Sequence, residues 1–164
     1  MSEPARQSGT VARLATGLAY AGGIVMLLAA LLCVASILRR WLLGQPITGD
    51  FELLALGTGI GVFGFLAYGT LMRSNIMVDT FTTALPRRWQ EGVDAFWSLV
   101  WAAVALVLAE RMTLGAYDTF ASGTTTMMVG LPTWWAVGIG ALCLLITGFA
   151  ALRGAWRLAA GKEG

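Results

Sequence analysis

Long apolar runs separated by short clusters of charge divide the chain into four segments. The first run, residues 14–38, contains no charged residue, and the second, residues 53–72, lies between Glu52 and Arg73. Both runs are at least as long as the roughly 20-residue helix that crosses a bilayer. Because an unpaired backbone group in lipid is costly, each run is predicted to be a helix.

The third apolar run is short, and its helix is expected to continue into the charged residues on either side. Its charge-free stretch, residues 95–109, spans only about 22 Å as a helix, less than the roughly 30 Å hydrocarbon core. The helix is therefore predicted to cover residues 93–114. Asp94 is then expected near one membrane interface, with Glu110 and Arg111 near the other.

The fourth run, residues 132–152, begins with Pro132, which suits the first turn of a helix because no amide donor is needed there. The sequence thus predicts an all-α integral membrane protein with one four-helix transmembrane domain over residues 1–164.

The connection between the second and third helices carries three apolar residues at helical spacing, Val78, Phe81 and Leu85. A short interfacial helix is expected there, and a solvated loop is the alternative.

Basic residues are divided unevenly between the two sides of the predicted bundle. With four spans, both termini and the middle connection share one side, which holds most of them: Arg6, Arg13, Arg73, Arg87, Arg88, Arg153, Arg157 and Lys162. The other side holds Arg39, Arg40 and Arg111. Because short cytoplasmic segments are enriched in Lys and Arg, both termini are predicted to be cytoplasmic.

Composition narrows the function. The chain is 57% hydrophobic and 12% charged, about half the charged fraction of a soluble domain. This excludes a soluble enzyme, a disordered tail and a nucleic-acid-binding module. There is no histidine, and Cys33 and Cys143 each lie inside an apolar run, where a thiol packs as a small apolar group. We therefore expect no catalytic residue, no metal and no cofactor.

The predicted spans carry no charged residue near their centres. Ion-coupled carriers usually place carboxylates or broken helices there. An accessory transporter subunit and a small self-assembling transporter or channel both remain open, whereas a haem or redox anchor is disfavoured by the missing histidines.

One familiar motif is misleading. Residues 59–64 spell G-x-G-x-x-G, but this dinucleotide fingerprint has meaning only between a strand and a helix, and here it lies inside a span. Gly57, Gly61 and Gly64 instead share one helix face, which predicts close packing against another helix.

Acidic residues open the second span. Asp50 is interpreted either as a capping residue favoured by the helix dipole or as a contact to a partner. Glu52 lies at the edge of the apolar run, where an unpaired carboxylate would be costly. A cationic partner is predicted for it, either Arg39 or Arg40 or a group on another subunit.

Three short motifs follow one another along the chain. They are Gly49-Asp50-Phe51-Glu52, then Asn75-Ile76-Met77-Val78-Asp79 with Leu85-Pro86-Arg87-Arg88, then Gly123-Thr124-Thr125 leading into Leu131-Pro132-Thr133-Trp134. With four spans, the chain resembles the small DctQ-like membrane subunit, the Q subunit, of TRAP (tripartite ATP-independent periplasmic) transporters. It departs from the family in Asn75, where histidine is frequent, and in its outer-loop threonines, where serine is frequent.

The resemblance implies a non-catalytic scaffold in a bacterial inner membrane. A large permease subunit would carry the sodium and substrate sites and move its transport domain, while this subunit packs against the static part. A periplasmic binding protein would deliver an organic acid, commonly a carboxylate. By position, the resemblance implies that Asp50 and Glu52 are partner contacts and that Asp79 anchors the middle loop. Arg39, Arg40 and Trp134 complete the candidate contacts.

The predicted orientation is testable with single cysteines in a variant that lacks Cys33 and Cys143. A cysteine at Gln45 should react with an impermeant maleimide added outside the cell. A cysteine at Thr83 should react only after the membrane is permeabilised, because its loop is expected to be cytoplasmic. The reverse pattern would contradict the charge asymmetry.

Overall fold

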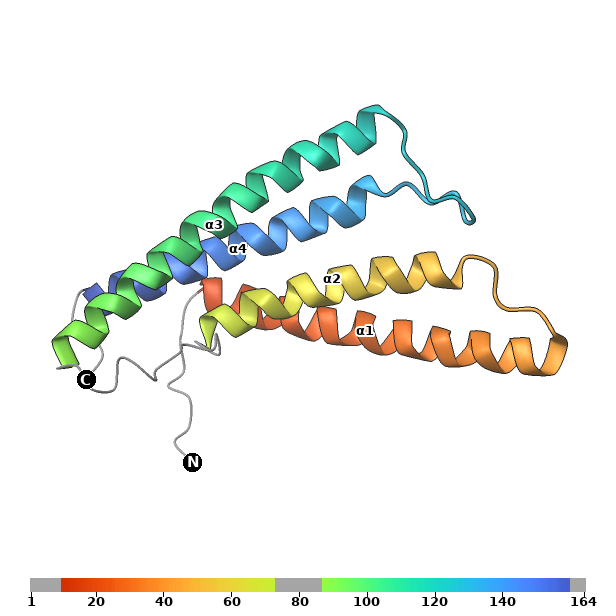
Figure 1. Cartoon of the computed structure of the whole chain (residues 1–164), viewed down its shortest axis with the longest axis horizontal. Helices are drawn as coiled ribbons and strands as arrows, with labels where there is room; N and C mark the ends of the chain where they lie inside the picture. The colour runs from red at the N-terminus through yellow and green to blue at the C-terminus, as the bar shows by residue number, and fades with distance from the viewer. Residues whose placement is uncertain (1–9, 73–86, 160–164) are drawn as a thin grey trace.

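Four long helices make up the part of the chain that the structure, a computed structural model, describes, residues 10–72 and 87–159 (Figure 1). Their bounds are α1 (Thr10–Leu43), α2 (Asp50–Leu71), α3 (Arg87–Ala121) and α4 (Trp134–Ala159). All four are long and apolar enough to cross a membrane. The predicted all-α, four-span architecture is confirmed. The predicted interfacial segment lies outside the described residues.

Two helices extend well past the apolar runs that predicted them. α1 has 34 residues and continues through Arg39 and Arg40 until Gly44, whose positive φ of 72° ends it. α3 has 35 residues, or about 52 Å of helix, which exceeds a roughly 30 Å hydrocarbon core. Hydropathy marks the apolar part of such a helix, while its backbone hydrogen bonds continue beyond it.

The start of α4 differs from the prediction. The helix begins at Trp134, so Pro132 lies outside its first turn. Pro132 instead pairs with Thr125 in an isolated antiparallel bridge. The carbonyl of Thr133 accepts the amides of Ala136 and Val137, at 3.1 and 3.3 Å, which makes Thr133 the residue that opens the helix.

The helices form two antiparallel hairpins, α1 with α2 and α3 with α4, which meet where α2 lies beside α4 (Figure 1). The connections 44–49 and 122–133 lie at the same end of the bundle, which we call the loop end. Toward the loop end the two hairpins diverge, and the 122–133 connection reaches from the α3–α4 hairpin toward the start of α2 (Figure 1).

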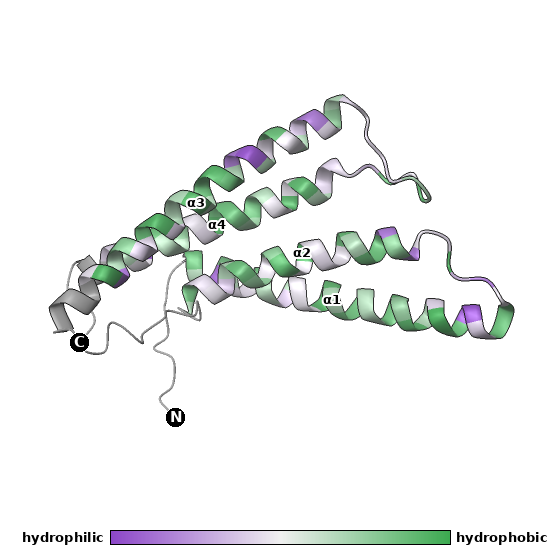
Figure 2. Ribbon diagram, in the orientation of Figure 1, coloured by the Kyte–Doolittle hydropathy of each residue, from purple (hydrophilic) through white to green (hydrophobic). Residues whose placement is uncertain are grey.

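The interior of the bundle consists of small residues. The most buried are alanines, including Ala15, Ala67 and Ala105 with no exposed surface, and the largest fully buried side chains are Thr147 and Cys143. Leucine, valine and aromatic side chains point outward along the helices, so the apolar colouring covers their outer faces (Figure 2). This is the arrangement expected where lipid surrounds the helices, because small residues let their backbones approach closely.

Glycines line the contact between α1 and α2. A Cβ atom added at Gly64 would lie 2.7 Å from the carbonyl oxygen of Leu18, and one added at Gly61 would lie 3.3 Å from that of Gly22. One added at Gly57 would meet the side chain of Ala29 at 3.2 Å. Gly22, which sequence patterning did not identify, therefore faces the glycines of α2 and completes the contact.

We expect Gly64→Ala to destabilise the bundle by about 1–3 kcal/mol, the usual cost of overpacking. The obstructing atom belongs to the backbone of α1, so the helices must separate to admit the methyl group. Gly59→Ala is the matched control, because a Cβ there meets nothing within 4 Å. Unfolding by SDS in mixed micelles measures both variants, and equal stabilities would contradict the close contact.

Candidate functional site

The candidate site lies at the loop end, and it begins with Gly49. This residue precedes α2 with φ 77°, in the left-handed region that favours glycine. It is buried, and a Cβ atom on it would collide with Cγ2 of Val129 in the 122–133 connection. Gly49 thus allows both the entry into α2 and the approach of the distant loop.

Asp50, the first residue of α2, joins that helix to α1. One carboxylate oxygen accepts a hydrogen bond from the hydroxyl of buried Ser36, and the other accepts the amide of Phe51 at 2.7 Å. The Ser36 oxygen in turn accepts the amide of Ile47 at 3.3 Å. Asp50 therefore satisfies an amide in the first turn and fixes the α1–α2 connection, where a negative charge also suits the helix dipole.

Glu52 joins the two hairpins. Its Oε1 accepts the amide of Met128 at 2.8 Å and its Oε2 accepts the amide of Val129 at 3.1 Å. Hydrogen bonds to an ionised carboxylate are stronger than those between neutral groups. Within the chain, the partners of Glu52 are thus two backbone amides rather than the predicted Arg39 or Arg40. Backbone donors carry no side-chain pattern, so they could not be predicted from the sequence.

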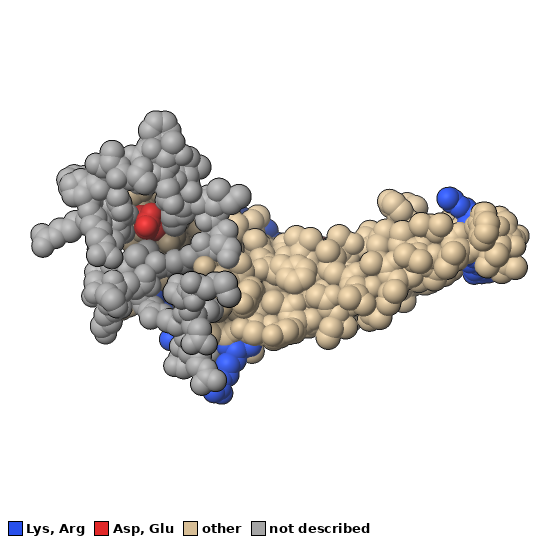
Figure 3. Space-filling model, turned by 90° about the horizontal axis from the view of Figure 1, so that it is seen from below, with Lys and Arg blue, Asp and Glu red and all other residues tan. Residues whose placement is uncertain are grey.

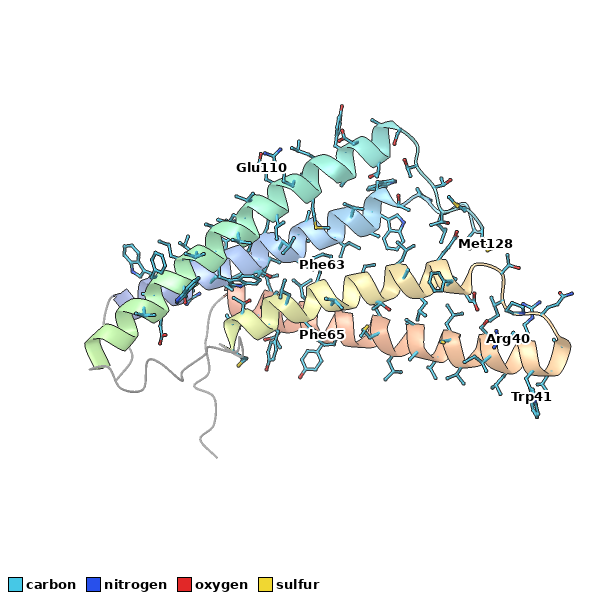
Figure 4. All side chains as sticks on the ribbon, viewed as in Figure 1. Arg40, Trp41, Phe63, Phe65, Glu110 and Met128 are labelled. Carbon is cyan, nitrogen blue, oxygen red and sulfur yellow. The ribbon has the colours of Figure 1, made fainter. Side chains whose placement is uncertain are left out.

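The uncharged 122–133 connection is folded into a small hairpin. The amide of Thr126 donates to the carbonyl of Leu131 at 2.9 Å, and the amide of Leu131 donates to the Thr126 hydroxyl at 3.0 Å. Gly130, with φ 69°, makes the turn between them. The tip carries exposed Met127 and Met128, and the latter lies beside the start of α2 (Figure 4).

We call the resulting network the clasp; it consists of Ser36, Gly49, Asp50, Glu52, Met128 and Val129. Its hydrogen bonds connect α1, α2 and the α3–α4 connection at the end where the helices diverge. Its carboxylates are occupied by donors of the same chain. No group of three or more His, Cys, Asp or Glu side chains that could hold a metal exists among the described residues. The clasp is therefore a structural brace.

Three of the remaining candidate contacts, Arg39, Arg40 and Trp134, do not join the clasp. Arg39 and Arg40 are exposed near the end of α1, and Trp134 packs its ring edge-to-face on Phe120, with centroids 5.6 Å apart. Asp79 lies outside the described residues. Basic side chains occur toward both ends of the face drawn in Figure 3, and a long uncharged surface separates them.

Two polar features of α3 lie outside the clasp. Near the opposite end of the bundle, Trp101 Nε1 donates to Thr70 Oγ1 at 3.1 Å and connects α3 to α2, a contact that was not predicted. Glu110 and Arg111 lie level with the part of α4 between Gly148 and Gly140, and their position near a membrane interface stays a prediction. Both are exposed, and Glu110 points away from α4 (Figure 4).

The fold and the clasp together define an integral membrane protein of four spanning helices whose interior is packed with small side chains. A family model for the DctQ component of tripartite ATP-independent periplasmic transporters matches residues 29–161, most of the chain. The chain therefore belongs to the DctQ family, the small permease component of TRAP transporters, as its motifs predicted. No curated protein and no solved structure gave a match.

Two glycines of similar conformation give a test of the clasp. Gly44→Ala should cost about 1–2 kcal/mol, the strain of a left-handed non-glycine residue, because a Cβ there meets nothing within 4 Å. Gly49→Ala should cost about 1–3 kcal/mol more, because it also overpacks Val129. Mixed-micelle unfolding measures both.

Adding Val129→Ala to Gly49→Ala should remove this extra cost, since the colliding atom is Cγ2 of Val129. Val129→Ala alone is the control for losing that side chain. If the double variant recovers no stability relative to this control, the loop does not lie against Gly49 in solution.

Proposed function

We propose that this chain is the static scaffold of a TRAP transporter that takes up an organic acid with sodium across a bacterial inner membrane. The observation that carries this proposal is the family match over residues 29–161, since the family is a transporter component rather than an enzyme family. The large permease subunit and the periplasmic binding protein of such a system are the proposed partners.

The packing of the bundle supports a scaffold over an autonomous carrier. Coupling groups of carriers face the bundle interior or a water-filled cavity. The buried interior of the described chain consists mainly of alanine, with Ser36, Thr70 and Thr147 as its polar members. Each of the three hydroxyls takes part in a hydrogen bond within the chain. The charged Glu110 lies on the outer surface, which suits a contact to another subunit better than an internal pathway.

The charge asymmetry gives the proposed orientation. Both termini are cytoplasmic, which makes the loop end periplasmic. The clasp and the exposed tip at Met127 then lie on the side where a binding protein delivers substrate. By holding the 122–133 connection against α2, the clasp would keep this side of the scaffold rigid while the transport domain of the permease moves.

Reconstitution tests the proposal. The chain should co-purify in mild detergent with the permease encoded beside it, and liposomes holding both should take up substrate when the binding protein and a sodium gradient are supplied. Omission of the chain should reduce uptake to the background of empty liposomes.

Two outcomes would contradict the proposal. One is full uptake by the permease and binding protein without the chain. The other is solute flux through the purified chain alone, which would favour the self-assembling transporter or channel.

A further inference from the structure

An adjacent acid and base lie on the outer surface of α3, within the part of the helix that is long and apolar enough to span a membrane. Glu110 and Arg111 are both exposed in the described chain, and Glu110 points away from the bundle (Figure 4). Neighbouring side chains on α3 are apolar and exposed as well, among them Val107, Leu108 and Leu114. The pair is thus a polar site among apolar side chains, and a second hydrophilic band lies nearer the end of α3 (Figure 2).

Contacts with α4 fix how far along the bundle the pair lies. A Cβ atom on Gly140 would lie 2.7 Å from Cε of Met112, and one on Gly148 would lie 2.8 Å from Leu106. Glu110 and Arg111 fall between Leu106 and Met112 and hence lie level with the part of α4 between these glycines. Gly140 and Gly148 are about 9 and 21 Å along the helix from Trp134, and both lie inside Trp134–Trp156, the part of α4 that is long and apolar enough to span a membrane.

A contact with α2 gives a similar level for Glu110 and Arg111 along the bundle. The Cβ atom on Gly140 would also lie 3.2 Å from the ring of Phe63, which is near the middle of α2 (Asp50–Leu71) and lies between α2 and α4 in Figure 4. Met112, Gly140 and Phe63 therefore share one level, and Glu110 is about half a turn of α3 away from it. The pair therefore lies close to the level of Gly140 in α4 and of Phe63 near the middle of α2.

Lipid is a poor environment for this pair. A charged side chain at the centre of a helix costs about 2.5–3.5 kcal/mol in insertion measurements, and such residues almost always face protein or water. Arginine can extend its charge along a long apolar stem, but glutamate has a short one. From Glu110 to the end of α3 at Ala121 is about 16 Å of helix.

α4 does not shield the pair from lipid. α3 lies on the outside of the described bundle, where its backbone contacts α4, and Glu110 is on its opposite face (Figures 1 and 4). A protein surface with complementary charge is therefore expected from outside the described bundle.

We infer that the face of α3 around Glu110, Arg111 and Leu114 binds the large permease subunit, which supplies a cationic group for Glu110 and an acceptor for Arg111. This inference rests on the proposed function, because the permease is the membrane partner of that proposal. The face combines apolar area with a charge pair. The apolar area contributes affinity, and the charges specify how the two subunits are positioned relative to each other.

Photo-crosslinking locates the partner directly. With p-benzoylphenylalanine at Leu114, one turn from Glu110, the chain co-expressed with the permease should give a crosslinked product of the two subunits. The same group at Leu28, an exposed residue of α1, is the matched control and should give at least about tenfold less product. A Leu114 product made only with a second copy of the chain, or no protein product, would overturn the inference.

Glu110→Leu tests the charge itself. The variant should keep the mixed-micelle stability of the isolated chain but retain at least about tenfold less permease on co-purification, because it leaves the cation of the partner unpaired. Asp118→Leu removes an exposed carboxylate nearer the end of the same helix and should retain the permease. Retention by Glu110→Leu equal to that of the wild-type chain would overturn the role of Glu110.

The two failures are distinguishable. If the wild-type chain does not bind the permease at all, the proposed function is wrong. The other case is that the wild-type chain binds the permease, but Leu114 gives no more crosslinked product than Leu28 and Glu110→Leu retains as much permease as Asp118→Leu. The proposed function then stands, and the interface lies elsewhere.

Discussion

Close approach of helix backbones is the constraint on which this structure depends. Lipid tails are as apolar as leucine, so burial of large side chains gives helices in a membrane little reason to associate. Contact must come from dispersion forces over surfaces that fit, and these act only at short range. Gly22, Gly61 and Gly64 provide such a surface between α1 and α2, and alanines provide it in the rest of the interior.

This way of packing explains why the clasp is needed. Small residues hold the hairpins together where α2 lies beside α4, but the helices diverge toward the loop end (Figure 1). There the chain uses directional bonds instead: Asp50 binds Ser36, and Glu52 binds the amides of Met128 and Val129. The 122–133 connection crosses the separation between the hairpins, and the hydrogen bonds of 2.8 and 3.1 Å attach it to Glu52. The clasp thus holds the two hairpins together at the loop end, where their helices are too far apart to pack against each other.

The sequence predicted what depends on composition and spacing. Charge-free runs located the four helices, and the spacing of Gly57, Gly61 and Gly64 located one face of a contact. It could not predict what depends on the backbone. Glu52 needed a partner, but its donors are amides 76 and 77 residues away, and every residue except proline has an amide.

The level of Glu110 along the bundle also depends on packing. Hydropathy gives the position of a residue only relative to the ends of its own apolar run. The centre of the α3 run does lie level with the middle of α4, because a Cβ atom on Gly148 would lie 3.6 Å from the carbonyl oxygen of Ala102. The run covers only residues 95–109, however, so its ends fall short of the ends of α4. Charges at the edge of a short apolar run can therefore lie beside the interior of a longer helix, on the surface that we infer another subunit covers.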